Sequence, residues 1–163
     1  MRSDADPKDR AWLSCSVADL AAAQGLQAPI TVTTSTPCAE AVAVMKEAGV
    51  DQLPVVRPFP GDAGELEVIA VVSMATLSRH MLSHPDKINA PCLPYASSKF
   101  VVVTPACTLD AVVDALNAYP DRRTGDAGVV IVADDQQGKK LLRYVVSRVD
   151  VVAFETDSLA RSK

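Results

Sequence analysis

Ser147 and Asp150 lie three residues apart at the end of the apolar stretch YVVSRVD, residues 144–150. A serine followed at this distance by an acidic residue is typical of a helix start, where both side chains accept hydrogen bonds from backbone N–H groups of the first turn. The alternative is that Asp150 contacts a ligand. The two residues by themselves leave both roles open, the helix cap and the ligand contact.

The cysteines and histidines do not have the spacing of a metal site. Cys15, Cys38, Cys92 and Cys107 are far apart, and neither histidine lies near a cysteine at ligand spacing. His80 and His84 fall four residues apart on an expected helix, which is also the spacing of a ligand pair. No acidic motif accompanies them, so we expect surface histidines, reduced thiols that fill apolar space, and no metal.

The composition indicates a globular protein and argues against two classes of partner. The 163 residues are 48% hydrophobic and carry a net charge of −4, with the basic residues scattered along the chain. Nucleic acid is therefore not an expected partner. The N-terminal run MRSDADPKDR is too polar for a signal peptide, and no apolar run approaches the roughly 18 residues that cross a bilayer. We expect no membrane association and a cytoplasmic location.

The elements that must position Ser147 and Asp150 belong to an internal repeat. The run ITVTTSTPCAEAVAVM (residues 30–45) is matched by FVVVTPACTLDAVVDAL (residues 100–116), with Glu40 aligned to Asp110 at a spacing of 70 residues. LPVV (53–56) matches VVIV (129–132) at a spacing of 76, and VVSMAT (71–76) matches VVSRVD (145–150) at 74. The near-constant spacing predicts two copies of one unit.

Each copy has the pattern strand, helix, strand, strand, helix. Apolar residues at helical spacing predict four helices, at residues 37–48, 107–118, 74–83 and from 148 past 154. Short β-branched runs predict the strands, and the polar stretches 57–67 and 134–140 predict hairpin loops. One unit of about 60 residues buries little apolar surface, so the copies should pack sheet to sheet as one pseudo-symmetric body. We expect disorder up to about Arg10 and after Thr156.

This repeat resembles a tandem pair of CBS domains, the Bateman module, over residues 16–156. A closer similarity is to the regulatory region of eukaryotic cystathionine β-synthases, in which a Trp and a V-x-[DE]-L precede P-[LI]-T-V and D-Q-x-P-V-V. The matching features are Trp12, Val17-Ala18-Asp19-Leu20, Pro29-Ile30-Thr31-Val32 and Asp51-Gln52-Leu53-Pro54-Val55-Val56. The stretch LPYASSKFVVVTPACTLDAV (93–112) is also similar to that family's entry into its second copy.

The resemblance implies an α/β (α+β) fold of two β-α-β-β-α CBS motifs packed as a pseudo-two-fold Bateman module. Residues 1–11 would be disordered or a linker from a catalytic core, and 12–86 the first motif. Residues 87–98 would be the linker, 99–157 the second motif and 158–163 a tail. It further implies homodimers and, as partner, the pyridoxal-phosphate core of the same enzyme. No phosphate cradle or catalytic lysine context is evident, so we expect no cofactor in this chain and no transsulfuration activity.

The resemblance also implies one binding site for an adenosyl ligand, with S-adenosylmethionine as the candidate. It assigns Asp150 and Ser147 to the ribose hydroxyls, since a carboxylate offers two acceptor oxygens to a diol. Thr76 holds the equivalent place in the first copy and offers no carboxylate. Pro29 and Ile30 would meet the adenine. Around the other end of the ligand the resemblance places Val50, Asp51, Gln52, Leu53, Tyr144, Val146 and Val149.

Two features keep other functions open. Asp51 would favour an amino acid moiety over phosphate, whereas Val50 stands where ligand-responsive animal enzymes carry an aromatic residue. Losing that ring would remove roughly 0.5–2 kcal/mol of cation–π attraction. The alternatives are a free-standing adenine-nucleotide sensor, if Arg143 and Arg148 meet phosphate beside Ser147, and a ligand-free dimerisation module.

Overall fold

The computed structural model describes residues 7–118 and 128–161, and these form two halves of the same construction. The first half comprises β1 (Val32–Thr33), α2 (Cys38–Ala48), β2 (Gln52–Pro58), β3 (Leu66–Ser73) and α3 (Met74–Ser83). The second comprises β4 (Val101–Val103), α4 (Leu109–Ala118), β5 (Val129–Gln136), β6 (Lys139–Ser147) and α5 (Arg148–Arg161). The predicted order, β-α-β-β-α twice, is confirmed.

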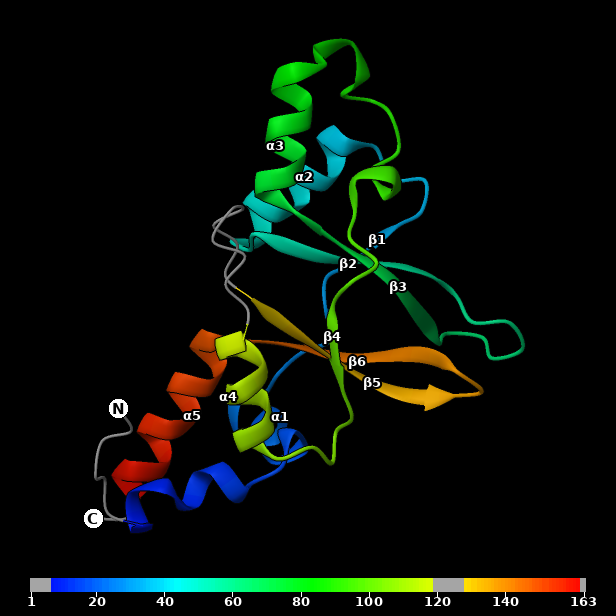
Figure 1. Cartoon of the computed structure of the whole chain (residues 1–163). Coiled ribbons are helices and arrows are strands. Elements are labelled where there is room, and N and C mark those ends of the chain that lie inside the picture. Colours follow the sequence, from blue (N-terminus) through cyan, green and yellow to red (C-terminus); the bar gives the residue numbers. More distant parts are fainter. Residues whose placement is uncertain (1–6, 119–127, 162–163) are drawn as a thin grey trace.

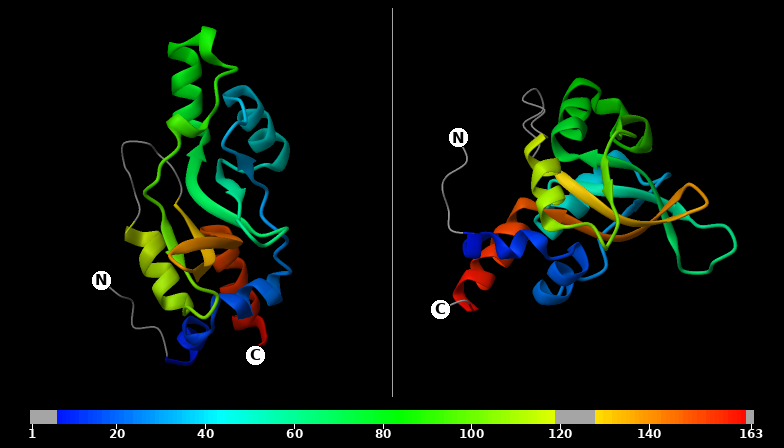
Figure 2. Two further views of the ribbon diagram at one scale, coloured as in Figure 1. Left: turned by 90° about the vertical axis from the view of Figure 1, so that its right-hand side faces the viewer. Right: turned by 60° about the horizontal axis from the view of Figure 1, so that its bottom comes forward.

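The strands form one curled sheet in the order β1-β2-β3-β6-β5-β4. In each half a parallel strand pair is followed by an antiparallel hairpin, and each hairpin has one register shift, at Val55/Val56 and at Val132/Ala133. The halves are joined edge to edge by the pairing of Glu67 with Leu141. In Figures 1 and 2 the strands lie between two groups of helices, α2 and α3 at one end and α1, α4 and α5 at the other.

Alternate residues of the strands supply different cores. Val130 and Val132 of β5 pack with the helices of the second half, whereas Ile131 and Ala133 face a cluster shared by both halves. That shared cluster contains Val56, Val68, Val71, Ile131, Ala133 and Leu142. A strand buried on both faces reads as a continuous apolar run, which explains the sequence VVIVA. The predicted packing of the two copies as one body is confirmed.

The segment before each half crosses over to the other half. The helix α1 (Val17–Gln24) buries Val17 and Leu20 in the core of the second half, and the residue before it, Ser16, pairs with Thr108. Pro91, which precedes the second half, pairs in the same way with Pro37. The two arrangements are equivalent: Leu109 N, at the start of α4, donates to Cys15 O, and Cys38 N, at the start of α2, donates to Ala90 O, each at 2.9 Å. The domain boundaries at residues 12, 86 and 99 stay predictions.

Three local predictions are wrong. Pro7–Ser14 is a 3₁₀-helix (η1), not a disordered segment, although residues 1–6 lie outside the described residues. The last helix continues beyond Thr156 to Arg161, because Phe154 is anchored in the second core. The expected loop 134–140 is mostly strand, closed by a two-residue turn in which Gln137 and Gly138 have φ of 56° and 79°.

Two further connections have a defined structure among the described residues. The loop between β2 and β3 is closed by a hydrogen bond from Phe59 N to Glu65 O of 2.9 Å. Between α3 and β4 the chain makes two 3₁₀ turns, η2 (Pro85–Lys87) and η3 (Leu93–Tyr95). Within the described ranges, no helix has both the length and the apolar character needed to cross a bilayer.

Candidate functional site

A cleft of about 640 Å³ opens between the two halves. Its walls come from four segments, within residues 26–30, 49–54, 128–129 and 145–150. The first two segments belong to the approach to β1 and to the α2–β2 junction. The last two are the start of β5 and the β6–α5 junction. The volume falls in the range of about 300–1,000 Å³ that small-molecule sites occupy.

Nine of the eleven residues predicted from the sequence line this cleft. They are Pro29, Ile30, Val50, Asp51, Gln52, Leu53, Ser147, Val149 and Asp150. The predicted placement of the other two, Tyr144 and Val146, at the same cleft is wrong. Val145 and Ser147 of β6 face the cleft, so the alternating residues Tyr144 and Val146 point to the opposite face of the strand. Val146 is fully buried in the second core, and Tyr144 lines a neighbouring cleft of about 410 Å³.

Several residues of the wall were not anticipated. They are Leu26, Gln27, Gly49, Pro54, Gly128, Val129 and Val145, whereas Arg148, also in the wall, was named in the nucleotide-sensor alternative. Strand alternation from Ser147 would have identified Val145. Leu26 and Gln27 carried no sequence signal, because their place depends on the crossing of α1 into the second half.

The α2–β2 junction holds Val50 and Asp51 at the cleft wall. Gly49 ends α2 in the left-handed region (φ 68°), which glycine adopts without strain, and Val50 N donates to Met45 O at 3.0 Å. The carbonyl of Asp51 accepts a hydrogen bond of 2.7 Å from Met74 N, the first residue of α3. Asp51 therefore has a fixed backbone and an exposed side chain.

Ser147 and Asp150 form a hydrogen-bonded pair at the start of α5. The Oδ2 atom of Asp150 accepts from the backbone N–H of Ser147 and from its hydroxyl, each at 2.8 Å. Both residues line the cleft. Among the described residues none donates a hydrogen bond to the second oxygen, Oδ1, so this oxygen is available to a diol or another donor.

The same pair of contacts occurs at α1, away from the cleft. Ser16 N and Ser16 Oγ each donate to Asp19 Oδ2 at 2.8 Å, and Ser16 Oγ accepts in return from Asp19 N at 3.1 Å. These bonds lower the pKa of Asp19, the backbone N–H having the largest effect. The contacts of Asp150 with Ser147 are thus what a helix cap produces in this fold. What distinguishes Asp150 from Asp19 is its position in the cleft.

The first half has a weaker version of the pair. Ser73 Oγ accepts from Thr76 N at 3.2 Å and donates to Thr76 Oγ1 at 3.0 Å. Ser73 thus caps α3 through the backbone N–H of Thr76, and threonine supplies no carboxylate at the position that Asp150 holds in the second half. The difference expected from the sequence between the two copies is present in the structure.

Arg148 lines the cleft but is bound to the end of α4. Its guanidinium donates to the carbonyl of Leu116 and, at 2.9 Å, to Oδ1 of Asn117. The last carbonyls of a helix carry partial negative charge and attract a cation. These two bonds fix the guanidinium against the C-terminal turn of α4.

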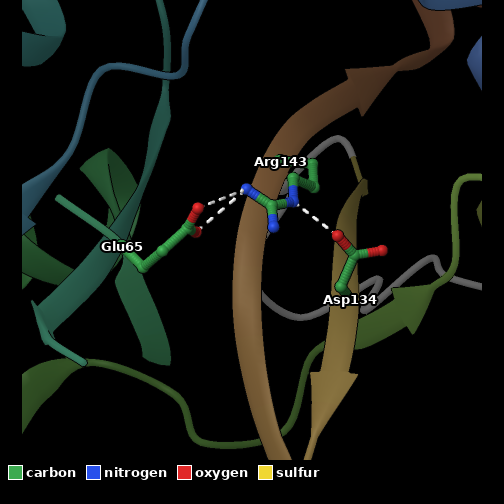
Figure 3. A network of polar contacts seen from close by, with 3 residues as sticks. All are labelled: Glu65, Asp134 and Arg143. Carbon is green, nitrogen blue, oxygen red and sulfur yellow. Dashed lines mark hydrogen bonds and ion pairs between the residues drawn. The ribbon is translucent and has the colours of Figure 1, made fainter. Parts of the chain in front are cut away.

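Arg143 lines the neighbouring cleft and is held by two carboxylates, one from each half (Figure 3). Its Nε donates to Asp134 at 2.5 Å, and its Nη1 donates to both oxygens of Glu65 at 2.9 and 3.0 Å. The bonds to Asp134, and then those to Glu65, raise the pKa of Arg143. Arg143 therefore links β5 and β6 to the loop before β3. The sequence hypothesis that Arg143 lies beside Ser147 is wrong. Arg143 is the extra residue at the register shift between β5 and β6, where Val132 pairs with Tyr144 and Ala133 with Leu142, and it lines the neighbouring cleft.

Exposed apolar side chains gather at the cleft. Five large hydrophobic residues are well exposed among those described, and three of them, Ile30 (51%), Val50 (41%) and Val149 (76%), line it. Such a surface is unfavourable in water unless something covers it. The cleft thus combines an apolar wall with a carboxylate at a helix start.

The thiols and histidines lie elsewhere. Burial raises the pKa values of Cys38 and Cys92, which keeps both protonated in the core of the first half. The ring of His80 stacks on Tyr95 with centroids 3.6 Å apart. In the part of the chain that the structure describes, no three potential ligands are grouped around a metal position.

Comparisons with known proteins give one consistent result. Residues 26–83 match the model of the CBS domain family. No curated protein matches the chain. The fold is similar to that of a Vibrio cholerae protein described as acetoin utilization protein AcuB, with TM-score 0.69 and 17% identity over 91% of this chain and 95% of that one.

Two further solved structures have the same fold. CbpB from Streptococcus agalactiae has TM-score 0.62 and 12% identity over 98% of this chain and 92% of its own. A structure of CbpB in complex with c-di-AMP has TM-score 0.64 and 11% identity over 94% and 93%. At these identities the similarity establishes the arrangement of the chain and not its ligand.

Proposed function

Residues 26–83 form a CBS domain and the whole chain has the fold of a CBS pair, and from this premise we propose that the protein is a regulatory module that binds an adenosine-containing ligand between its two halves. The proposed role is binding and not catalysis. The observation that carries it is the joining, in one cleft, of exposed apolar side chains with the carboxylate of Asp150.

Each part of the cleft has a chemical role in this proposal. Ile30, Val50 and Val149 cover the faces of the purine, which removes their exposed apolar surface from water. Asp150 accepts hydrogen bonds from the ribose hydroxyls at Oδ1, while Oδ2 keeps its two bonds to Ser147. Ser147 thereby orients the carboxylate before the ligand arrives.

Binding at this place would couple the two halves. The wall segments within residues 26–30 and 49–54 belong to the approach to the first half and to the first half itself. The segments within 128–129 and 145–150 belong to the second half. A ligand that contacts both walls stabilises one relative position of the halves, because anything that binds only the native arrangement shifts the equilibrium toward it. Control of a partner protein through this change is the proposed regulatory role.

The comparisons support a CBS pair acting as a module in its own right. The three solved structures described above are each matched over more than nine-tenths of their length, and one of them is a complex with c-di-AMP. That complex supports an adenine nucleotide as the kind of ligand this fold accommodates.

A second candidate is the regulatory region of a cystathionine β-synthase. Its support is the sequence similarity at Pro29-Ile30-Thr31-Val32 and Asp51-Gln52-Leu53-Pro54-Val55-Val56, all within or beside the cleft wall. In that case the ligand is S-adenosylmethionine and the partner a pyridoxal-phosphate core. Under either candidate we propose a cytoplasmic protein that pairs with a second copy of itself.

The test is calorimetric titration of the protein with adenosine, AMP, ATP, c-di-AMP and S-adenosylmethionine, with guanosine as the matched control. We expect saturable binding of at least one adenosine derivative, one per chain, together with a rise in melting temperature. Guanosine should bind more weakly. Absence of heat and of any thermal shift with all five would contradict the proposal and favour the ligand-free assembly module.

A further inference from the structure

We propose that Cys38 and Cys92 are a redox-sensitive pair, which a low-molecular-weight disulfide, oxidised glutathione, converts into a disulfide bond between the start of α2 and the connection that leads to β4. The bond would lie within the first half and would not depend on a ligand in the cleft. Main-chain pairing, burial and the direction of one thiol define its site.

Main-chain pairing holds the two cysteines on the same side of two short segments. Pro37 pairs with Pro91 in antiparallel orientation, and each cysteine directly follows one of these prolines. The backbone N–H groups of Cys38 and Cys92 both donate across the pair, at 2.9 and 2.8 Å. Side chains alternate between the two faces of paired segments, so both cysteines point away from the face of the prolines. They are therefore diagonal neighbours on one face.

The side chains of the two cysteines lie in the core of the first half. Both residues are fully buried, at 0% exposure, and belong to one apolar cluster. The Sγ atom of Cys38 lies 3.8 Å from the carbonyl oxygen of Pro91, the residue before Cys92. Diagonal neighbours have Cα atoms about 7–8 Å apart and disulfides span about 4.4–6.8 Å, so a relative shift of roughly 1 Å closes the difference.

The other two cysteines provide a contrast at the equivalent crossing in the second half. Ser16 pairs there with Thr108, and Cys15 and Cys107 each precede one of these residues. Both cysteines are partly exposed, and the thiol of Cys107 donates to the carbonyl of Thr108, its own neighbour, at 3.7 Å. This thiol turns along its own segment, whereas the thiol of Cys38 reaches the opposite one. The first-half pair is therefore the one positioned to form a bond.

The bond would fix the connection between α3 and β4 to the first half. After Cys92 the chain forms η3, and Ser97 then exchanges two main-chain hydrogen bonds with Val71 of β3, of 2.8 and 2.9 Å. A link to Cys38 would close a ring of 92 − 38 = 54 residue steps that contains α2, β2, β3 and α3. Such a cross-link stabilises the native state mainly by restricting the unfolded chain. Cytosolic disulfides are usually transient and redox-sensing, so the bond would form under oxidising conditions and be reversed by free thiols.

The reaction is a thiol–disulfide exchange in two steps. One protein thiolate attacks a sulfur atom of oxidised glutathione, which breaks that S–S bond and releases one glutathione. The other protein thiolate attacks the mixed disulfide and releases the second glutathione, so two protein thiols are oxidised, one disulfide is reduced, and the two protons pass to the released thiols. Burial raises the pKa of both cysteines, and the charge of Cys38 adds to this effect at Cys92, so the reaction requires a transient opening of the pair.

The test uses the full chain with the double substitution Cys15→Ser and Cys107→Ser, in which Cys38 and Cys92 are the two remaining cysteines. The folded protein is incubated with excess oxidised glutathione at a pH of about 8, where thiolates become available. Free thiols are then alkylated in denaturant, and the chain is digested with trypsin. We expect both thiols to be lost and the peptides 11–46 and 88–99 to be joined by a disulfide that dithiothreitol cleaves. The oxidised form should melt about 5–10 °C higher than the reduced form.

Two further proteins complete the experiment. Cys92→Ala in the same background should form no link and take up at most one glutathione. The parent should form the same link as the double variant, and a protease that cleaves before Asp19 separates Cys15 from Cys38 for its assignment. The parent also supplies the answer if the double variant does not fold.

Four results would overturn the proposal. They are retention of both free thiols by the folded protein, glutathione adducts without the link, a link between two chains, and a link between Cys15 and Cys107 in place of the proposed one. A linked form that melts below the reduced form would also contradict it, because the native pairing would then not suit the bond. None of these results bears on ligand binding in the cleft.

Discussion

The Oδ2 atom of Asp150 accepts two hydrogen bonds of 2.8 Å from Ser147, and the Oδ2 atom of Asp19 accepts two of the same length from Ser16. One pair borders the cleft and the other does not. The chain thus contains its own control for separating the structural role of the pair from a role in binding.

Replacing Asp150 with alanine should weaken adenosyl-ligand binding at least tenfold, since charge-assisted hydrogen bonds to the ribose contribute roughly 1.5–3 kcal/mol each. Loss of the cap should cost only about 0.5–1 kcal/mol of folding free energy. Titration calorimetry and ligand-free melting curves measure the two effects separately.

Asp19→Ala and Thr76→Ala are the matched controls for this prediction. Both should leave the affinity unchanged, because Asp19 and Thr76 lie outside the cleft wall. Asp19→Ala should lower the melting temperature, because Asp19 accepts a hydrogen bond from Ser16 N in the cap of α1. Thr76→Ala removes only the hydroxyl that accepts from Ser73 Oγ and keeps the backbone N–H that Ser73 caps, so its effect on melting should be smaller. An affinity of Asp150→Ala equal to that of the parent would show that Asp150 is only a cap.

The ion pair between Arg143 and Glu65 should stabilise the contact between the two halves modestly. Both side chains are about one-third exposed, at 33% and 27%, so we expect a coupling energy of about 0.5–1 kcal/mol in a double-mutant cycle of Arg143→Met and Glu65→Gln. Urea unfolding measures it. The cycle for Lys140 and Asp135, a pair within one hairpin and more exposed, should give a smaller value. A coupling no larger than that of the Lys140 pair would show that Arg143 does not hold the halves together.

His80 should make the protein less stable as the pH falls below about 6.5. Burial, and then the nearby charges of His84 and Lys87, lower its pKa, while Asp86 acts in the opposite direction. The unfolded chain therefore binds a proton at His80 more readily than the folded chain does. The contribution of neutral His80 to the free energy of unfolding is fully present above the unfolded pKa of about 6.5, and it decreases as the pH falls below that value. Melting temperatures at pH 7.5 and 5.5 should show this loss.

Two variants separate the ring stacking of His80 from its protonation. One keeps an aromatic ring at position 80, and the other keeps the titrating histidine. His80→Phe retains the stack on Tyr95 and should make melting less dependent on pH over this range. His84→Asn should retain most of the dependence. The same slope in His80→Phe as in the parent would assign the pH effect to other groups.

Self-association should involve α5, where Val152 is 56% exposed and lies outside the cleft wall. We expect dimers at micromolar concentration in sedimentation velocity, and monomers for Val152→Asp. Leu82→Asp, at an 84% exposed site on α3, tests whether that helix also takes part. Leu77 and Val151, on the same two helices, are buried in the cores and are unsuitable for such a test. A monomeric parent would contradict the prediction.

The sequence by itself determined the local elements and their repetition. Apolar spacing predicted α2, α3, α4 and α5 to within two residues at their starts, as Met74–Ser83 and Leu109–Ala118 illustrate, but it did not predict α1. It also placed Ser147 and Asp150 at a helix start, since a cap depends on residues only three apart. The family resemblance then suggested which segments meet, and nine of its eleven residues line one cleft.

Only the tertiary structure determined which of these segments pack against each other and which side chains face the cleft. The crossing of α1 into the second half depends on where Val17 and Leu20 find apolar surface to bury, and no local pattern encodes that choice. Strand alternation along β6 turned Tyr144 and Val146 away from the cleft, and the register shift between β5 and β6 placed Arg143 at the neighbouring cleft. Glu65, which binds Arg143, lies 78 residues away in sequence, and Asn117, which binds Arg148, lies 31 residues away. The charge in and beside the cleft therefore results from packing, which brings together groups that are distant in the chain.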